Sequence, residues 1–554
     1  IQTTYSPRFE WTNYLFHKAA ASPDSGSQNG RVERTHTKDF YWQWDNMLKW
    51  NKTFGKHAFD FTFLANWEKF QRWHDEMTNE NFLPTDELGY GGIGFGTSPN
   101  VSSDDVYRTG DAFMGRLHYV YDQRYLITAT VRRDGYSAFG LANPRATFPA
   151  IALGWVFSEE KFLHRPDWFE YGKLRLSWGK NGNRAVGTYA AFMQLAPRKY
   201  IYVDPATGSL VTANTFYAST MANPNLKWES TTSWNIGTDL TFLKGRLSAN
   251  LDVYKKITTD LLVSRELPSL IGYSSVMSNI GEVQNTGVEL SLNSTNIRMD
   301  KLTWRTSFSL AYNKNKITHL YGIMEDVKDA DGNVIGQREA DDIKNKRFIG
   351  HDIDEIWDYK VVGIWQEEER EEAAKYGQQP GDVHLLDKDM NYKYDNTDKE
   401  FQGTTMPRLR WSMRNDFTLF KNFNISFNMY SYIGHKKTLG RFTNDNALLN
   451  VTNQIKRDYW TPENRNNEYP RLANKKPAGV SYAIYKNASF LRFDNISIGY
   501  TFPKKLIEPL RIQNLNVNAT MKNAGYISGW PGYDPENSDA NTPRVIYFGI
   551  NLTL

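Results

Sequence analysis

Hydrophobic and polar residues alternate along most of this 554-residue chain, and residues 279–296 show the pattern clearly. In that segment Val288, Leu290 and Leu292 occupy every second position, and Glu289 lies between the first two. Because successive side chains of a β-strand point to opposite faces, this period of two predicts a strand with one apolar and one polar face. A soluble sandwich would bury the apolar face, whereas a membrane barrel would turn it to lipid.

Similar segments recur from end to end and come in pairs that predict hairpins. Residues 234–253 place apolar side chains on one face of each of two strands around a turn at Lys244 and Gly245. The whole chain predicts about 16 strands of about 10 residues each, the length that crosses the apolar layer of a membrane at a tilt. One short helix is predicted over Gln366 to Gly377.

The predicted connections alternate between short turns and long polar loops. The short turns are Thr53 to Lys56, Tyr121 to Arg124, Lys244 to Gly245, Ser294 to Lys301, Lys421 to Asn422 and Pro503 to Arg511. The long loops are Glu68 to Thr109, Gly179 to Glu229, Asn313 to Met406, Gly434 to Asn487 and Asn523 to Pro543. Short turns on one rim and long loops on the other are typical of outer-membrane β-barrels. The fold predicted is therefore an all-β transmembrane antiparallel β-barrel, with Val288, Leu290, Leu292, Trp304 and Phe308 facing lipid and Glu289 and Ser291 facing a wet lumen.

Composition narrows the function classes. The 66 Lys and Arg nearly balance the 62 Asp and Glu without a basic cluster, which argues against nucleic-acid binding. Cysteine is absent, so disulfides and thiolate metal sites are excluded. Aromatic residues make up 14% of the chain although its mean hydropathy is -0.61, and Tyr and Trp near strand ends suit interfacial girdles. The chain carries none of the common catalytic or nucleotide-binding motifs, and we expect no enzyme. It opens without Met or a signal peptide, from which we expect a processed, truncated or cut start.

An acidic segment is the candidate metal site. Asp387, Asp389, Asn391 and Asp398 occupy positions 1, 3, 5 and 12, the oxygen spacing of an EF-hand-like calcium loop. Its sixth position is Tyr392, where a sharp turn favours Gly. Calcium is thus a candidate ligand and a solvated acidic loop the alternative; no cofactor is required.

Three aromatic residues of the predicted loops are candidate substrate-binding groups. Trp365, Trp460 and Trp530 are expected to be exposed, where an indole can stack on a sugar ring or pack on a partner, and packing within the loops is favoured over both. Residues 89–100 contain a G-x-G-x-G run, but it lies in a loop and predicts no phosphate site.

The order of several segments resembles the C-terminal part of SusC-like transporters (the SusC/RagA family), the TonB-dependent outer-membrane importers of Bacteroidetes. The segments that carry the resemblance run from about Val131 to Leu554 and are "VRRDGYSAFG", "FPAIALGWVFSEEKF", "LRLSWGKNGN", "NPNLKWESTTSWNIGTDLTFLKGRLSANLDVYKK", "NIGEVQNTGVEL", "FLRFDNISIGYTFP", "GYDPE" and "FGINLTL". The chain departs from the family at Leu554, where the usual last residue is Phe, at Tyr392, where the family has Gly, and in "DGYSAFG".

The resemblance implies active import of nutrient oligomers across the outer membrane. It implies a barrel of roughly 22 strands, so residues 1–554 correspond to its C-terminal portion, and the N-terminal plug and first barrel strands are expected in a part absent from this sequence. The implied partners are a SusD-like surface lipoprotein, TonB through that absent N-terminal region, outer-membrane lipid and the substrate. Oligosaccharide is the favoured substrate. A peptide importer, a siderophore or cobalamin receptor, and, from another class, a soluble carbohydrate-binding or adhesin protein remain open.

Overall fold

The computed structural model describes residues 1–22, 29–82, 87–273, 275–329, 331–439, 458–472, 474–537 and 540–554. The chain forms two compact units. The first comprises Ile1–Trp155, Arg175–Trp234 and Lys256–Glu282, and the second comprises Val156–Leu174, Asn235–Lys255 and Val283–Leu554.

Sixteen strands form one sheet in which the strand order follows the chain. They are β1 (Gln2–Lys18), β2 (Arg31–Phe54), β3 (His57–Glu80), β4 (Asn100–Tyr121), β5 (Tyr125–Tyr136), β6 (Arg145–Trp155), β7 (Phe169–Asn183), β10 (Glu229–Phe242), β11 (Leu247–Thr259), β14 (Glu282–Arg298), β15 (Leu302–His319), β22 (Leu409–Leu419), β23 (Phe423–Ile433), β26 (Phe490–Thr501), β27 (Asn514–Ser528) and β28 (Val545–Thr553). The predicted number of strands and the all-β class are confirmed. β1 and β28 stand at the two ends of the strand order.

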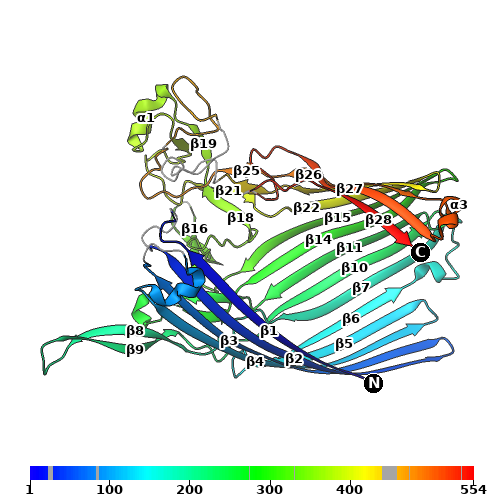
Figure 1. Cartoon of the computed structure of the whole chain (residues 1–554), viewed down its shortest axis with the longest axis horizontal. Helices are drawn as coiled ribbons and strands as arrows, with labels where there is room; N and C mark the ends of the chain where they lie inside the picture. Colours follow the sequence, from blue (N-terminus) through cyan, green and yellow to red (C-terminus); the bar gives the residue numbers. More distant parts are fainter. Residues whose placement is uncertain are drawn as a thin grey trace. The chain divides into compact units, whose positions relative to one another are not determined.

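The first unit contains the longest strands, which lie side by side in Figure 1. β2 and β3 have 24 residues each and β4 has 22, so the expected length of about 10 is wrong for these strands. The loop expected over Glu68 to Thr109 is also too long, because β3 and β4 stay paired as far as Thr78 and Asn100. The sequence pattern fails there because main-chain hydrogen bonds continue through segments in which the regular alternation of apolar and polar residues is lost.

Register shows that five neighbouring strands of the first unit, β2 to β6, share an apolar face. Trp50, Phe61, Leu117, Ala129 and Ile151 form one row across five neighbouring strands. The row is exposed: Phe61 keeps 37%, Leu117 42% and Ile151 43% of its surface. A soluble sandwich would cover such a row with a second layer. The apolar face of the sheet is therefore not covered by protein, as in a membrane barrel, where the opposite, polar face is the one in contact with water.

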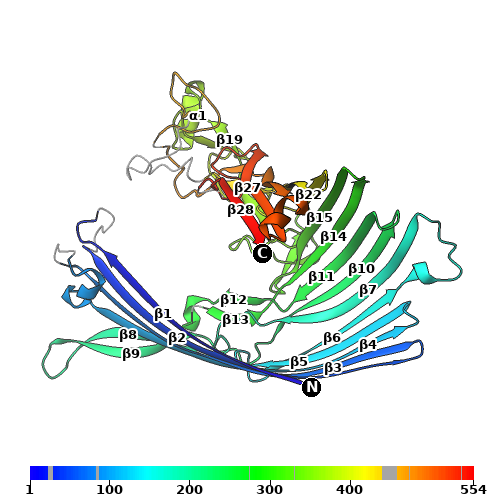
Figure 2. The ribbon, with the colours of Figure 1, turned by 45° about the vertical axis from the view of Figure 1, so that its right-hand side comes forward.

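The second unit repeats this division, and its strands β14 and β15 are seen side by side in Figure 2. Across β15, β22, β23, β26, β27 and β28 the register aligns an apolar row of Trp304, Phe417, Ile425, Ile498, Ala519 and Phe548. The neighbouring row on the other face is Arg305, Asp416, Ser426, Ser497, Thr520 and Tyr547. A hydrogen bond of 2.8 Å from Ser307 to Asn293 fixes which residues of β14 share each face. The expected grouping of Val288, Leu290 and Leu292 with Trp304 and Phe308 is confirmed; lipid contact at these five positions stays a prediction.

The connections follow the predicted alternation of short and long. The six predicted short turns all join neighbouring strands of the sheet. The predicted long loops hold β8 (Gln194–Val203), β9 (Leu210–Thr220), β16 (Met324–Lys328), β17 (Val334–Glu339), β18 (Glu355–Tyr359), β19 (Val361–Ile364), β20 (Val383–Leu385), β21 (Lys399–Thr404), β24 (Lys436–Thr438) and β25 (Tyr485–Asn487). A further long connection, between β11 and β14, was not predicted and holds β12 (Leu262–Glu266) and β13 (Ser275–Asn279). Part of the loop predicted over Gly434 to Asn487, residues 440–457, lies outside the described residues.

Helices are few and short in the part of the chain that the structure describes. They are the 3-10 helices η2 (Gly89–Phe95), η3 (Phe157–Glu159), η4 (Ser269–Ile271), η5 (Glu367–Glu369) and η7 (Glu508–Leu510), and the α-helices α1 (Arg370–Lys375) and α3 (Lys504–Ile507). η5 and α1 confirm the helix predicted over Gln366 to Gly377. None of the described helices has the length and apolar character needed to span a membrane.

Candidate functional site

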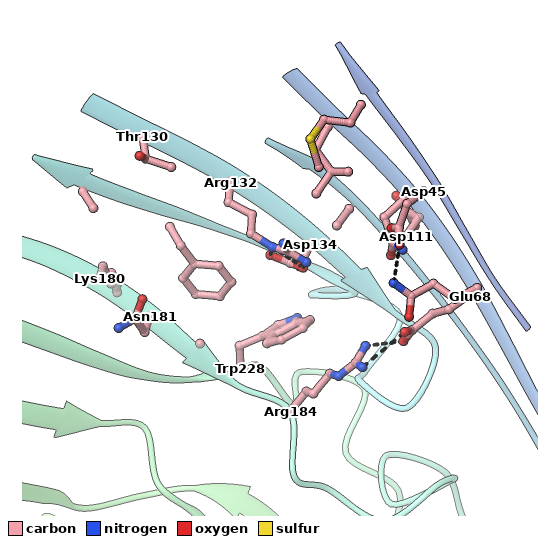
Figure 3. A pocket seen from close by; sticks show the side chains of 18 of the residues that line it. Asp45, Glu68, Asp111, Thr130, Arg132, Asp134, Lys180, Asn181, Arg184 and Trp228 are labelled. Carbon is pink, nitrogen blue, oxygen red and sulfur yellow. Dashed lines mark hydrogen bonds and ion pairs between the residues drawn. The ribbon is translucent and has the colours of Figure 1, made fainter. Parts of the chain in front are cut away.

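A hollow of about 800 Å³ opens over the polar face of the first unit (Figure 3). Its floor follows from the register, because Thr4, Asp45, Asn66, Ala112 and Asp134 form one row across β1 to β5. The small side chain of Ala112 keeps the middle of the row low. A polar face that lines a hollow, on strands whose other face is apolar and exposed, is the arrangement of a wet barrel lumen.

Most charged and amide groups of the hollow are paired with one another. Arg132 donates to Asp134 two positions along β5 at 2.8 and 2.9 Å. Asp45 accepts hydrogen bonds of 2.7 Å from Asn66 and from Gln43, one at each carboxylate oxygen. These contacts fix the planes of the side chains; the Arg132–Asp134 pair is neutral as a whole, whereas Asp45, bonded to two uncharged amides, keeps its negative charge.

A second ion pair lies at the end of β7. Arg184 forms an ion pair with Glu68 of β3, and the Tyr41 hydroxyl donates to the same carboxylate at 3.4 Å. The Arg184 guanidinium also lies 5.0 Å from the ring centre of Tyr136. These contacts link β2, β3 and β5 to residues that follow β7.

Trp228 closes one side of the hollow and belongs to an apolar cluster. The cluster comprises Tyr136, Ala138, Phe139, Phe148, Ala191, Leu226 and Trp228. The Trp228 ring stacks on Phe139 with centroids 4.7 Å apart and meets Phe148 edge-on at 5.7 Å. Only 6% of the residue is exposed, and its indole Nε1–H has no hydrogen-bond acceptor among the described residues.

Two glycines make room for these groups. A Cβ on Gly182 would lie 2.1 Å from the Phe148 ring, and a Cβ on Gly110 would lie 2.7 Å from the Glu68 carboxylate. Both positions therefore require close approach rather than an unusual backbone angle. The sequence pattern pointed to neither glycine, because a close approach depends on the register of a neighbouring strand.

The candidate metal site lies in the second unit, and three of its four residues come together. One carboxylate oxygen from each of Asp387, Asp389 and Asp398 lies within 4.8 Å of the others. That is close to the separation of two oxygens on opposite sides of a calcium ion, since each would lie about 2.4 Å from it. Asn391 instead donates its amide to Asp389 at 2.8 Å. Tyr392 adopts φ of 65°, so this residue supplies the left-handed turn for which Gly was expected.

The electrostatics of the acidic loop reflect this crowding. Burial and the neighbouring Asp387 carboxylate raise the pKa of Asp389. Although burial opposes ionisation of Asp387, hydrogen bonds from the Tyr376 hydroxyl and from backbone amides lower its pKa. A divalent cation would relieve the repulsion between these two carboxylates, so the donor set fits calcium.

The three candidate tryptophans are buried, and the expectation that they are exposed is wrong. Trp365 stacks on His384 with centroids 3.5 Å apart, and its Nε1 donates to Gln378 at 3.1 Å. Trp460 donates to Gln366 at 3.0 Å. Trp530 packs in the loop core that comprises Tyr359, Val383, Leu385, Leu439, Ile484, Ala488 and Trp530. None of the three presents a free ring face for a substrate, because packing of the long loops covers the indoles.

A buried ion network, not predicted as a site, holds the loop after β27. Arg492 of β26 contacts Asp534 at 2.6 Å and Glu536 at 2.7 Å, and it also donates to Asn523. The Tyr430 hydroxyl of β23 donates to Glu536 at 2.6 Å. Arg492 and Asp534 are almost completely buried. Both acidic residues belong to the "GYDPE" segment. The two carboxylates that flank its Pro were the only feature of the sequence that could have indicated this network.

Comparisons with known proteins agree with this architecture. A family model described as "TonB dependent receptor-like, beta-barrel" matches residues 1–524. The chain belongs to this family. TonB-dependent receptors of this kind are outer-membrane proteins and transporters, not enzymes, and the soluble alternative is thereby excluded.

Among individual relatives, this TonB-dependent receptor is similar to SusC, as the order of its segments indicated. It is 32% identical to SusC of Bacteroides thetaiotaomicron over 467 residues, covering 80% of this chain and 43% of that protein. A TonB-dependent receptor of Formosa agariphila is 27% identical over 605 residues, covering all of this chain and 57% of that protein. The structure of the RagAB peptide transporter matches 99% of this chain and 59% of its own with a TM-score of 0.77 at 19% identity, which shows a shared fold. The chain thus spans about half the length of the curated relatives.

Proposed function

We propose that this receptor imports nutrient oligomers across the outer membrane, with oligosaccharide as the first substrate class. In this proposal residues 1–554 form the larger part of the barrel wall, and the plug and first strands belong to an N-terminal part of the same protein. A SusD-like surface lipoprotein lies over the long loops, and TonB supplies energy through the N-terminal part.

The two-faced sheet carries the proposal. Its exposed apolar rows suit lipid, and its other face lines a hollow of about 800 Å³ with paired charges and amides. Such a polar surface gives a hydrophilic solute a route that lipid would deny it. The volume lies within the range of ligand pockets, about 300–1,000 Å³.

A peptide is the second substrate class, and one observation favours it. The RagAB structure that shares this fold is described as a peptide transporter. Against it, the likeness to RagAB at 19% identity shows the fold alone, and the resemblance of the ordered segments to SusC-like transporters implies oligosaccharide first. We therefore rank oligosaccharide first and include peptides as an arm of the test.

The test is uptake by cells that carry the full-length receptor and its neighbouring lipoprotein gene. A strain without the receptor is complemented with the intact gene, and uptake of fluorescent oligosaccharides and of fluorescent peptides is measured with and without a protonophore. Energy-dependent uptake of oligosaccharides by the complemented strain alone is the expected result. Uptake of peptides only would overturn the ranking, and equal uptake by both strains would overturn import by this receptor.

A further inference from the structure

A second cavity, of about 350 Å³, adjoins the hollow described above and shares Glu68 and Arg184 with it. Its wall includes Tyr41 of β2, Phe70 of β3 and Arg108 of β4, which the register aligns in one row. This row lies on the same face as the floor of the hollow but four residues further along each strand, about 13 Å toward the connection between β3 and β4. A solute that enters from the side of the long loops would therefore meet this cavity before the hollow.

The Arg108 side chain is held in place, but its charge is unpaired. The guanidinium lies 4.2 Å from the centre of the Phe70 ring, a cation–π contact. It donates no hydrogen bond to any of the described residues, and the Asp39 carboxylate on the same face is occupied, because Arg72 donates to each of its oxygens at 2.7 Å. Arg108 is half-buried, and none of its nitrogens belongs to the fully buried atoms that lack a partner. Its N–H groups are thus both unused and accessible.

The other charges at the cavity do not balance Arg108. Glu68 and Arg184 form an ion pair that is neutral as a whole. Lys69 belongs to the opposite face of β3 by the period of two, and its ammonium lies 4.9 Å from the ring centre of Tyr107. Among the described residues, Arg108 is therefore the one charge facing the cavity without a counterion.

The adjoining hollow adds no net charge, because its ion pairs are neutral and the remaining Asp45 and Lys180 have opposite signs. The polar face is therefore positive where Arg108 stands. A guanidinium presents N–H groups in a planar fork that matches two oxygens of one anionic group. A carboxylate or sulfate in the cavity would gain these charge-assisted hydrogen bonds without breaking an existing pair, whereas an ammonium group would be repelled.

We propose that this cavity is a binding subsite for an acidic sugar unit, whose carboxylate or sulfate group pairs with Arg108. The proposal rests on the proposed function, since it assumes that oligosaccharides pass along the polar face. The Tyr41 hydroxyl and the Asn183 amide of the cavity wall can exchange hydrogen bonds with the hydroxyl groups of the same sugar. Figure 3 shows the Glu68–Arg184 pair, which lies where the cavity meets the hollow.

The test measures dissociation constants of the full-length receptor, in complex with its lipoprotein, for oligogalacturonate, oligomannuronate and sulfated galactan oligomers. Each is compared with its carboxyl-reduced or desulfated counterpart, and a peptide of Asp and Glu forms a further arm. The wild type should bind a uronate or a sulfated sugar about 10- to 100-fold more tightly than the neutral counterpart. Arg108→Gln should lose this preference. Arg116→Gln is the matched control and should keep it, because it removes the same charge from the same face of β4, eight residues away.

A second variant covers the case in which Arg108→Gln fails to fold. Arg108→Lys keeps the positive charge but not the planar fork, and it should reduce the preference about 3- to 10-fold. Equal or tighter binding of the neutral counterparts, binding of the acidic peptide alone, or binding of no oligosaccharide would overturn the proposal.

An unchanged preference in both Arg108 variants would also overturn it, and a lower thermal midpoint would then show that Arg108 pairs with a segment of the receptor itself. Energy-dependent uptake of any oligosaccharide in these cases leaves the proposed function standing, so the two can fail separately.

Discussion

Replacing Arg492 by Met should destabilise the second unit strongly. The guanidinium is 2% exposed and contacts the carboxylates of Asp534 and Glu536 at 2.6 and 2.7 Å. Removing it leaves two negative groups together, one of them fully buried, without their cation. Removing one partner of a buried ion pair costs about 3–5 kcal/mol. Because Arg492 also donates a hydrogen bond to Asn523, we expect Arg492→Met to lie toward the upper end of that range.

The assay is equilibrium unfolding of the full-length receptor in lipid vesicles, with limited proteolysis of residues 529–544 as a local readout. Arg465→Met is the matched control, because Arg465 pairs with Glu368 at 2.5 Å on the surface, where the two side chains are 47% and 67% exposed. The control should leave stability unchanged, since exposed pairs contribute little. An Arg492→Met protein as stable as this control would refute the reasoning.

The same network predicts a dependence on pH. Burial alone would raise the pKa of Asp534, but hydrogen bonds to the carboxylate and the Arg492 guanidinium outweigh it and lower this pKa to about 2. A depressed carboxyl pKa stabilises the fold above its unfolded value of about 3.9, and that contribution is lost as pH falls toward 2. Wild-type stability should therefore fall between about pH 4 and 2, and Asp534→Asn should show a flatter profile over that range.

Three further predictions concern lipid, calcium and the loops. Leu290→Arg should cost about 2–4 kcal/mol if this position lies near the bilayer midplane, measured by unfolding in vesicles, whereas Ser291→Arg on the other face should be tolerated. Calcium at 100 times its dissociation constant should stabilise the fold by about 2.7 kcal/mol and so raise the thermal midpoint relative to a chelator, and Asp398→Asn should remove the increase; equal midpoints would favour a solvated acidic loop. In a complex with the lipoprotein, the loops predicted over 313–406 and 434–487 should show slower hydrogen exchange than in the receptor alone, and unchanged exchange throughout would contradict a contact there.

Strand number, face assignment and the alternation of turns were predictable because they depend on residues close in sequence. The period of two around Leu290 shows which side chains share a face whatever the neighbouring strand is. Strand length was not predictable in β2 and β3, since residues such as Glu76 and Asp75 carry no apolar signal and are held by main-chain pairing alone.

The hollow could not be predicted from the sequence for a different reason. Its floor places Thr4 and Asp134, which are far apart in sequence, in one row, and only the register of five strands aligns them. The burial of Trp365 and Trp460 depends likewise on how one long loop packs on another. Local patterns therefore showed which faces were polar, but not where polar groups converge or which aromatic rings are covered.

The length of β2, β3 and β4 has a mechanical consequence. A strand of 24 residues extends about 80 Å, and at a tilt of about 45° it rises more than 50 Å, roughly twice the apolar band of about 25 Å. The same continuous ladder therefore runs from the lipid into water as a stiff collar. A force applied along a strand at its outer end would be shared by many inter-strand hydrogen bonds at once, and these bonds would not break one after another. Such a collar can carry a load applied to the ends of these strands without deforming the part of the wall that lies in the membrane.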